Sequence, residues 1–177
     1  MFFCFIVVFI FLTDPCASAK TRKVTKLVHK VCAKTSDYTF CVESLYADPH
    51  TAEADEYFLA NIAFRLAYVN ATSTQHHIDK LLKKLGTSRP SHYQRRLQRC
   101  RSDYKKGVSA IEMGLNDLNS ESFDLLAGYA GVAAHAAGDC QSSFKGTHSP
   151  LTSMNNDLKG LCEICVVISK LFTDPNL

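Results

Sequence analysis

Apolar residues recur every three or four positions along three long stretches in the second half of the chain, at residues 93–118, 123–144 and 154–172. This spacing places one apolar stripe along each helix, as in antiparallel helical bundles. Polar residues 119–122 predict a turn between the first two helices, and Ser149-Pro150 separates the second helix from the third. The pattern therefore predicts three consecutive amphipathic helices that run alternately up and down.

A fourth long helix is predicted ahead of these three, at about residues 51–85. It follows Asp48-Pro49 and stops before Gly86, a residue type common at helix C-termini. The apolar residues slip out of register halfway along; they are Phe58, Ile62, Leu66, Val69, Ile78, Leu81, Leu82 and Leu85. The slip coincides with Asn70-Ala71-Thr72, an acceptor sequence for N-glycosylation, and a glycan on Asn70 has to face solvent.

Two short apolar-faced helices are predicted before the bundle, at residues 24–32 and 38–46, on either side of the turn Thr35-Ser36-Asp37. Helices of this length do not persist alone in water. Cys32 and Cys41 lie symmetrically about that turn, and Cys100 and Cys140 lie symmetrically about the turn at residues 119–122. Helices that run out and back from a turn bring equidistant residues face to face. Each pair is therefore expected to form a disulfide within its own helical hairpin.

The predicted fold is all-α: a four-helix up-and-down bundle (residues 51–173) with an N-terminal helical hairpin (residues 20–47) and two disulfides. A protein with structural disulfides belongs in an oxidising compartment. Residues 2–12 are apolar but too few to span a bilayer, which takes about 20 residues. Ala17-Ser18-Ala19 follows as a small-x-small cleavage site, so residues 1–19 are interpreted as a secretory signal peptide. No Lys or Arg precedes the apolar run, which leaves a retained signal anchor as the alternative.

The segment beyond residue 19 carries all 20 Lys and Arg and 16 of the 17 Asp and Glu, a net charge of +4. It is long enough for one domain with a substantial core. Much of the basic charge falls within 27 residues, at Lys80, Lys83, Lys84, Arg89, Arg95, Arg96, Arg99, Arg101, Lys105 and Lys106. Nucleic acid is not expected as a partner of a secreted chain.

Three segments together resemble plant invertase and pectin methylesterase inhibitors. Residues 31–45, with Cys32, Thr35 and Cys41, resemble the opening hairpin signature of that family. Residues 97–104 resemble its L-x-x-C-x-x-x-Y helix, and residues 134–144, which contain Asp139-Cys140, resemble the helix that supplies the partner cysteine. The resemblance implies a secreted four-helix bundle that docks on a cell-wall or vacuolar carbohydrate enzyme and blocks it without performing chemistry.

The sequence departs from the family pattern in two places. Ser143 stands before Phe144 where the family usually has glycine, and Gly138-Asp139 stands before Cys140 where a threonine is usual. Invertase inhibitors often carry Pro-Lys-Phe near the start of the second long helix, and here that place is occupied by residues 90–93, Pro-Ser-His-Tyr. The departure weakens the case for invertase without identifying the target.

The sequence gives little support for catalysis, metal binding or thiol chemistry. No nucleophile lies on the Gly-flanked strand-to-helix turn that presents an esterase serine. The His76-His77-Ile78-Asp79 cluster could suggest a metal site, but a short cluster of this kind is more often solvated surface. Cys162 and Cys165 form C-x-x-C on a predicted helix, and with no strand nearby they are interpreted as buried thiols, with a bond between them or to another chain left open. No enzyme activity, metal or cofactor is expected.

The basic residues Arg95, Arg99 and Lys106 are predicted to project from the second long helix opposite its apolar stripe. They are either an ordinary solvated face or a contact surface for an acidic protein partner or anionic pectin. The function predicted from the whole sequence is inhibition of a pectin methylesterase by covering its substrate cleft, in the apoplast or cell wall. The alternatives are an inhibitor of cell-wall or vacuolar acid invertase, and a non-inhibitory structural or allergen-like wall protein.

Overall fold

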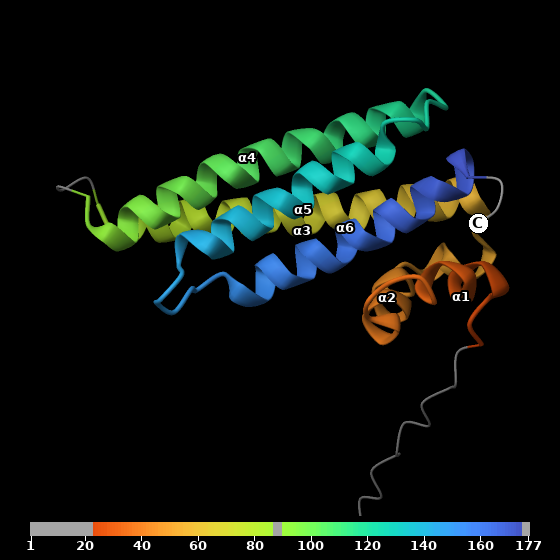
Figure 1. The fold of residues 1–177 in the computed structure, drawn as a ribbon, viewed down its shortest axis with the longest axis horizontal. Coiled ribbons are helices and arrows are strands. Elements are labelled where there is room, and N and C mark those ends of the chain that lie inside the picture. Colours follow the sequence, from red (N-terminus) through yellow and green to blue (C-terminus); the bar gives the residue numbers. More distant parts are fainter. Residues whose placement is uncertain (1–22, 87–89, 175–177) are drawn as a thin grey trace, which may run out of the picture.

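The computed structural model describes residues 23–86 and 90–174, and all regular elements in this part of the chain are helical. Four long helices run up and down side by side, and each packs against two of the others (Figure 1). A hairpin of two short helices lies beside this bundle, against α3 and α6. The elements are α1 (Lys26–Cys32), α2 (Tyr38–Leu45), the 3₁₀ helix η1 (Pro49–Glu53), α3 (Glu56–Lys84), α4 (His92–Asn119), α5 (Leu126–Ser143) and α6 (Thr152–Thr173). The predicted all-α bundle with its hairpin is confirmed, whereas the predicted signal peptide lies outside the described residues.

The helix starts follow local capping chemistry. The side chains of Thr25, Asp37, Asp55 and Ser91 each accept a hydrogen bond from a backbone N–H of the first turn of α1, α2, α3 and α4. The prediction that the first long helix begins near residue 51 was wrong. The 3₁₀ turn of η1 comes first, and α3 begins only at Glu56, because Asp55 is extended and caps it.

The buried face of α3 differs from the predicted stripe. Phe58 and Val69 are 43% and 61% exposed, whereas Leu59 and Phe64 are fully buried. Alanines supply much of the remaining buried surface; they are Ala60, Ala63, Ala67 and Ala71. These small side chains let neighbouring helices approach closely. The contact of Phe64 with Gly114 of α4 is so close that a Cβ on the glycine would lie 2.5 Å from the Phe64 ring.

Both disulfides are present. Cys32 is bonded to Cys41 with a Cα–Cα distance of 5.5 Å, and Cys100 is bonded to Cys140 with a Cα–Cα distance of 4.4 Å. The first joins α1 to α2, and the second joins α4 to α5. By loop-closure entropy, loops of about 10 and about 41 residues correspond to about 2.7 and about 4 kcal/mol of stabilisation. Each bond thus restrains one helix pair, as the symmetric spacing about the turns predicts.

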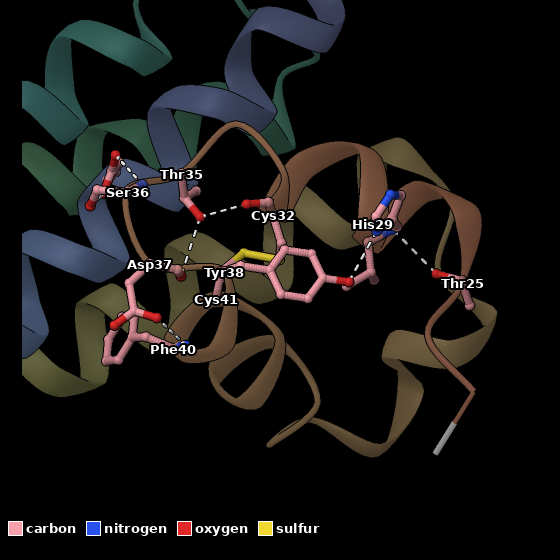
Figure 2. The surroundings of a disulfide bond; sticks show 11 residues. Thr25, His29, Cys32, Thr35, Ser36, Asp37, Tyr38, Phe40 and Cys41 are labelled. Atoms are coloured by element: carbon pink, nitrogen blue, oxygen red, sulfur yellow. Dashed lines mark hydrogen bonds between the residues drawn. A yellow bond between two sulfur atoms is a disulfide. The ribbon is translucent and has the colours of Figure 1, made fainter. Parts of the chain in front are cut away.

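The hairpin is held on the bundle by contacts between its turn and α6. Ser36 donates two hydrogen bonds to the Glu163 carboxylate, from its backbone N–H at 2.8 Å and from its Oγ at 2.6 Å. Thr35 Oγ1 braces the turn by donating to the Cys32 carbonyl oxygen at 2.8 Å (Figure 2). The Phe40 ring lies directly over Gly160 of α6, with no space left for a Cβ. These polar and apolar contacts hold the turn of the hairpin against α6, and Val28, Val31 and Leu45 of the hairpin are buried in the core.

Candidate partner-binding face

The basic face of the molecule lies on α4 and consists of Arg95, Arg99 and Lys106, all exposed. On the opposite side of the same helix, Leu97 and Cys100 are buried in the core. The predicted division of α4 into an apolar and a basic side is therefore confirmed. The residues from Arg95 to Lys106 span about 16 Å of helix, because each residue adds about 1.5 Å.

The basic face contains a shallow depression near the start of α4. A depression of about 220 Å³ is lined by His92, Arg95, Arg96, Arg99 and Ser143, and we call it the arginine hollow. Arg95 donates a hydrogen bond to the Pro90 carbonyl oxygen at 2.7 Å. These residues come from the first two turns of α4 and the last residue of α5, which the bundle brings together.

Arg96 is the most firmly held of the three arginines. It is half-buried, donates a hydrogen bond to the Thr147 hydroxyl, and lies over the Phe144 ring with its guanidinium carbon 5.9 Å from the ring centre. Tyr93 packs edge-to-face on the same ring at 6.0 Å and remains 39% exposed. The sequence could not reveal this arrangement, because Arg96 and Thr147 are 51 residues apart.

Among the described residues, the arginines of the arginine hollow have no acidic partner at ion-pair distance. The only ion pair among residues 23–86 and 90–174 joins His50 to Asp48. Asp103, on the same helix, interacts electrostatically with Arg99; it is 8% exposed and has one buried oxygen without a hydrogen-bond partner within this part of the chain. Burial raises the pKa of Asp103, nearby Asp139 adds to this effect, and Lys106 and Arg99 oppose it.

A buried polar network ties three helices together beneath this face. The Tyr104 hydroxyl donates to Asn155 Oδ1 at 2.8 Å, and Asn155 Nδ2 donates to Gln141 Oε1 at 2.8 Å. Asn155 is fully buried, and burial also raises the pKa of Tyr104. Sequence analysis missed Asn155, because a lone asparagine on a helix carries no periodic signal.

Two further cysteines in the described part of the chain are thiols. Cys162 and Cys165 lie on α6, are both buried, and form no disulfide among the described residues. Burial raises the pKa of Cys162 to about 12 and raises that of Cys165 as well. Such thiols are poor nucleophiles and metal ligands, because the reactive form is the thiolate. Within the described residues no group of three or more metal-ligating side chains comes together, and His76 is exposed.

The acceptor sequence at Asn70 lies within an unbroken helix. The predicted slip does not interrupt α3, and Thr72 Oγ1 donates to the Tyr68 carbonyl oxygen at 2.8 Å. Asn70 is half-buried, and its Oδ1 is buried without a hydrogen-bond partner among the described residues. Glycosylation of Asn70 therefore stays a prediction.

Sequence and structure comparisons identify the relatives of this chain. The sequence profile of the family described as plant invertase/pectin methylesterase inhibitor matches residues 26–168. The chain belongs to this family. It is 26% identical to a pectinesterase inhibitor of Actinidia deliciosa, over 97% of the chain and 92% of that protein. It is 30% identical to the cell wall / vacuolar inhibitor of fructosidase 2 of Arabidopsis thaliana, over 96% of the chain and 93% of that protein.

The fold comparison agrees with the family assignment. The crystal structure of a mutant form of a pectin methylesterase inhibitor from Arabidopsis superposes with a TM-score of 0.70, at 21% identity, over 83% of this chain and 97% of that one. The plant invertase/pectin methylesterase inhibitor family consists of proteins that inhibit enzymes, so the expectation that the chain is not itself an enzyme is confirmed. None of the described helices is long and apolar enough to cross a membrane.

Proposed function

We propose that this chain inhibits a plant pectin methylesterase. The relatives named above are inhibitors of either pectinesterase or a fructosidase, so family membership alone does not choose between them. The observation that carries the choice is the start of α4, where residues 90–93 differ from the Pro-Lys-Phe motif often found in invertase inhibitors. This segment caps and begins α4 with Ser91 and leads directly into the arginine hollow.

The proposed mechanism is steric. The bundle covers the substrate cleft of the target and contributes no chemistry of its own. Two disulfides and the Glu163–Ser36 contact hold the surface in one shape, which reduces the ordering cost of binding. The basic face of Arg95, Arg99 and Lys106 accelerates association with a partner that is acidic around its cleft.

Inhibition of an acid invertase is the second candidate function. The specific observation in its favour is the identity of 30% to the inhibitor of fructosidase 2, together with 32% identity over 142 residues to a putative invertase inhibitor of Platanus orientalis, which covers 76% of the chain and 79% of that protein. A structural or allergen-like wall protein with the same fold and no inhibitory activity is the remaining alternative.

The proposal includes secretion to the apoplast or cell wall, with the vacuole as the alternative site. It is supported by two disulfides, which form in oxidising compartments, and by the name of the fructosidase inhibitor relative. Residues 1–19 then act as a signal peptide, and N-terminal sequencing of the mature protein should begin at Lys20. In the wall, the basic face also meets anionic pectin.

The deciding experiment measures inhibition of a plant pectin methylesterase and of an acid invertase side by side, at about pH 5 and about pH 7, two conditions on either side of the ordinary pKa of a histidine side chain, about 6.5. Inhibition of the pectin methylesterase with little effect on the invertase supports the proposal. The reverse result identifies the chain as an invertase inhibitor. If neither enzyme is inhibited while both disulfides are intact, the chain is a structural or allergen-like wall protein.

The role of the basic face is tested with matched charge variants. One variant replaces the basic face by glutamine, and the other removes three exposed lysines of the hairpin region; they are R95Q/R99Q/K106Q and K26Q/K30Q/K34Q. The first should slow association with the target and make it less sensitive to salt, and the second should not. Equal effects of both variants would mean that only net charge matters.

A further inference from the structure

The arginine hollow is lined by three arginines and one histidine. We infer that it is a binding site for the carboxylate groups of an acidic polysaccharide, a chain of uronic acids. This inference deepens the contact with anionic pectin and rests on the proposed function for the choice of a wall polymer as the ligand. The hollow, at about 220 Å³, is several times the share of one water molecule in the liquid, which is about 30 Å³. It therefore has room for a carboxylate and part of a sugar ring.

The first argument is unbalanced charge. Arg95 uses one N–H for the Pro90 carbonyl, Arg96 uses one for the Thr147 hydroxyl, and Arg99 has no hydrogen-bond or ion-pair partner in residues 23–86 and 90–174. A guanidinium has five N–H donors, so most donors of the three groups point to solvent or into the hollow. Three like charges held close together repel one another, and a bound anion removes that cost.

The second argument is pre-organisation. The contacts of Arg96 with Thr147 and the Phe144 ring fix a side chain that would otherwise lose much rotamer freedom on binding a ligand. Arg95 is likewise held by the Pro90 carbonyl. An ordinary solvated face has flexible, separately hydrated charges, whereas two of the three guanidinium groups here are already oriented.

The third argument concerns the chemical class of the ligand. The planar guanidinium fork matches the two oxygens of a carboxylate. Next to His92 of the hollow, Tyr93 offers a partly exposed aromatic ring against which a sugar can pack, and this ring packs edge-to-face with Phe144. Further along α4, the basic face continues to Lys106. A polymer with one carboxylate per sugar can therefore engage several cations at once.

The test uses the full chain without any enzyme. Polysaccharide binding is therefore measured independently of enzyme inhibition, and either property can be absent while the other is present. Binding of polygalacturonic acid and of highly methyl-esterified pectin is measured by titration calorimetry at low salt. The wild type should bind polygalacturonic acid, and the esterified polymer should bind at least about tenfold more weakly, because its esters cannot form charge-assisted hydrogen bonds. Equal binding of the two polymers, or no binding of polygalacturonic acid, would overturn the inference.

Matched variants locate the site. R95Q/R99Q should weaken binding at least about tenfold, whereas K26Q/K30Q, with the same change in net charge on exposed residues of α1, should change it by less than about twofold. R96K retains the charge but not the fork, and it should also weaken binding. Equal losses in the two double variants would show diffuse attraction and refute a site. Loss of enzyme inhibition in R95Q/R99Q, with no polysaccharide binding by the wild type, would assign the hollow to the protein partner instead.

Discussion

Gly160 of α6 offers a sharp test of how the hairpin is seated. A Cβ at this position would lie 2.5 Å from Cε1, 3.0 Å from Cδ1 and 3.1 Å from Cζ of the Phe40 ring. Gly160→Ala therefore forces either the ring or the hairpin to move. Overpacking of this kind costs about 1–3 kcal/mol. Alanine, however, favours an α-helix over glycine by about 1 kcal/mol. The net expectation is a loss of about 0–2 kcal/mol in the free energy of unfolding.

Removal of the ring should reverse the sign of this effect. In a Phe40→Ala background the clash is absent, so Gly160→Ala should gain about 1 kcal/mol from helix propensity alone. The double-mutant cycle then gives a coupling free energy of about 1–3 kcal/mol between the two positions, the size of the overpacking cost. Urea unfolding followed by circular dichroism, with both disulfides intact, measures all four proteins on one scale.

Gly138 of α5 is the matched control, because it is also in a helix and a Cβ there would meet nothing within 4 Å. Gly138→Ala should stabilise the protein by about 1 kcal/mol in either background. The reasoning would be refuted if Gly160→Ala stabilised the wild type as much as Gly138→Ala does. That result would mean that Phe40 does not press on α6 and that the hairpin is seated by other contacts.

Three further predictions follow from the core. Because burial raises the pKa of Asp103 above 3.8, the folded state binds the extra proton, so its contribution to stability is complete below pH 3.8 and is lost as the pH rises through the folded pKa. The free energy of unfolding of Asp103→Asn, measured by urea titration, should therefore rise relative to that of the wild type as the pH is raised from 4 to 7. Parallel pH profiles of the two proteins would contradict this. Cys100→Ser should cost up to about 4 kcal/mol, lower the Tm and release a titratable Cys140. Cys162 and Cys165 should react with a thiol reagent only after denaturation, and rapid reaction of the native protein would show that they are accessible.

Local patterns were sufficient to predict the hairpins. The distance of a cysteine from a turn is set by the chain itself, so the equal spacing of Cys32 and Cys41, and of Cys100 and Cys140, fixes which residues face each other. The 3.6-residue period likewise determines which side of α4 is basic. Both predictions depend on residues within one helix or one helical hairpin.

Features that depend on contacts between helices were predicted only in part. On α3, Phe58 is more hydrophobic than Ala63, yet Phe58 is exposed and Ala63 is buried. The reason is that α3 packs closely against α4 and α6, so small residues occupy part of the contact. The predicted stripe is therefore right only in part: Ile62 and Ile78 are buried, but Phe58 is not. The contacts of Arg96 and the role of Asn155 were not predicted for a related reason, since the partners that position these side chains lie on other segments.

The structure separates the residues that stabilise the fold from those that are exposed to a partner. The hairpin contacts with α6 and the start of α4 lie towards opposite ends of the bundle (Figure 1). Arg95 and Arg99 are exposed, whereas Gly160 lies under the Phe40 ring. Substitutions at distant sites without shared partners act additively. A change in binding caused by the arginine variants therefore reports on the surface itself, and a change in stability caused by Gly160→Ala reports on the hairpin.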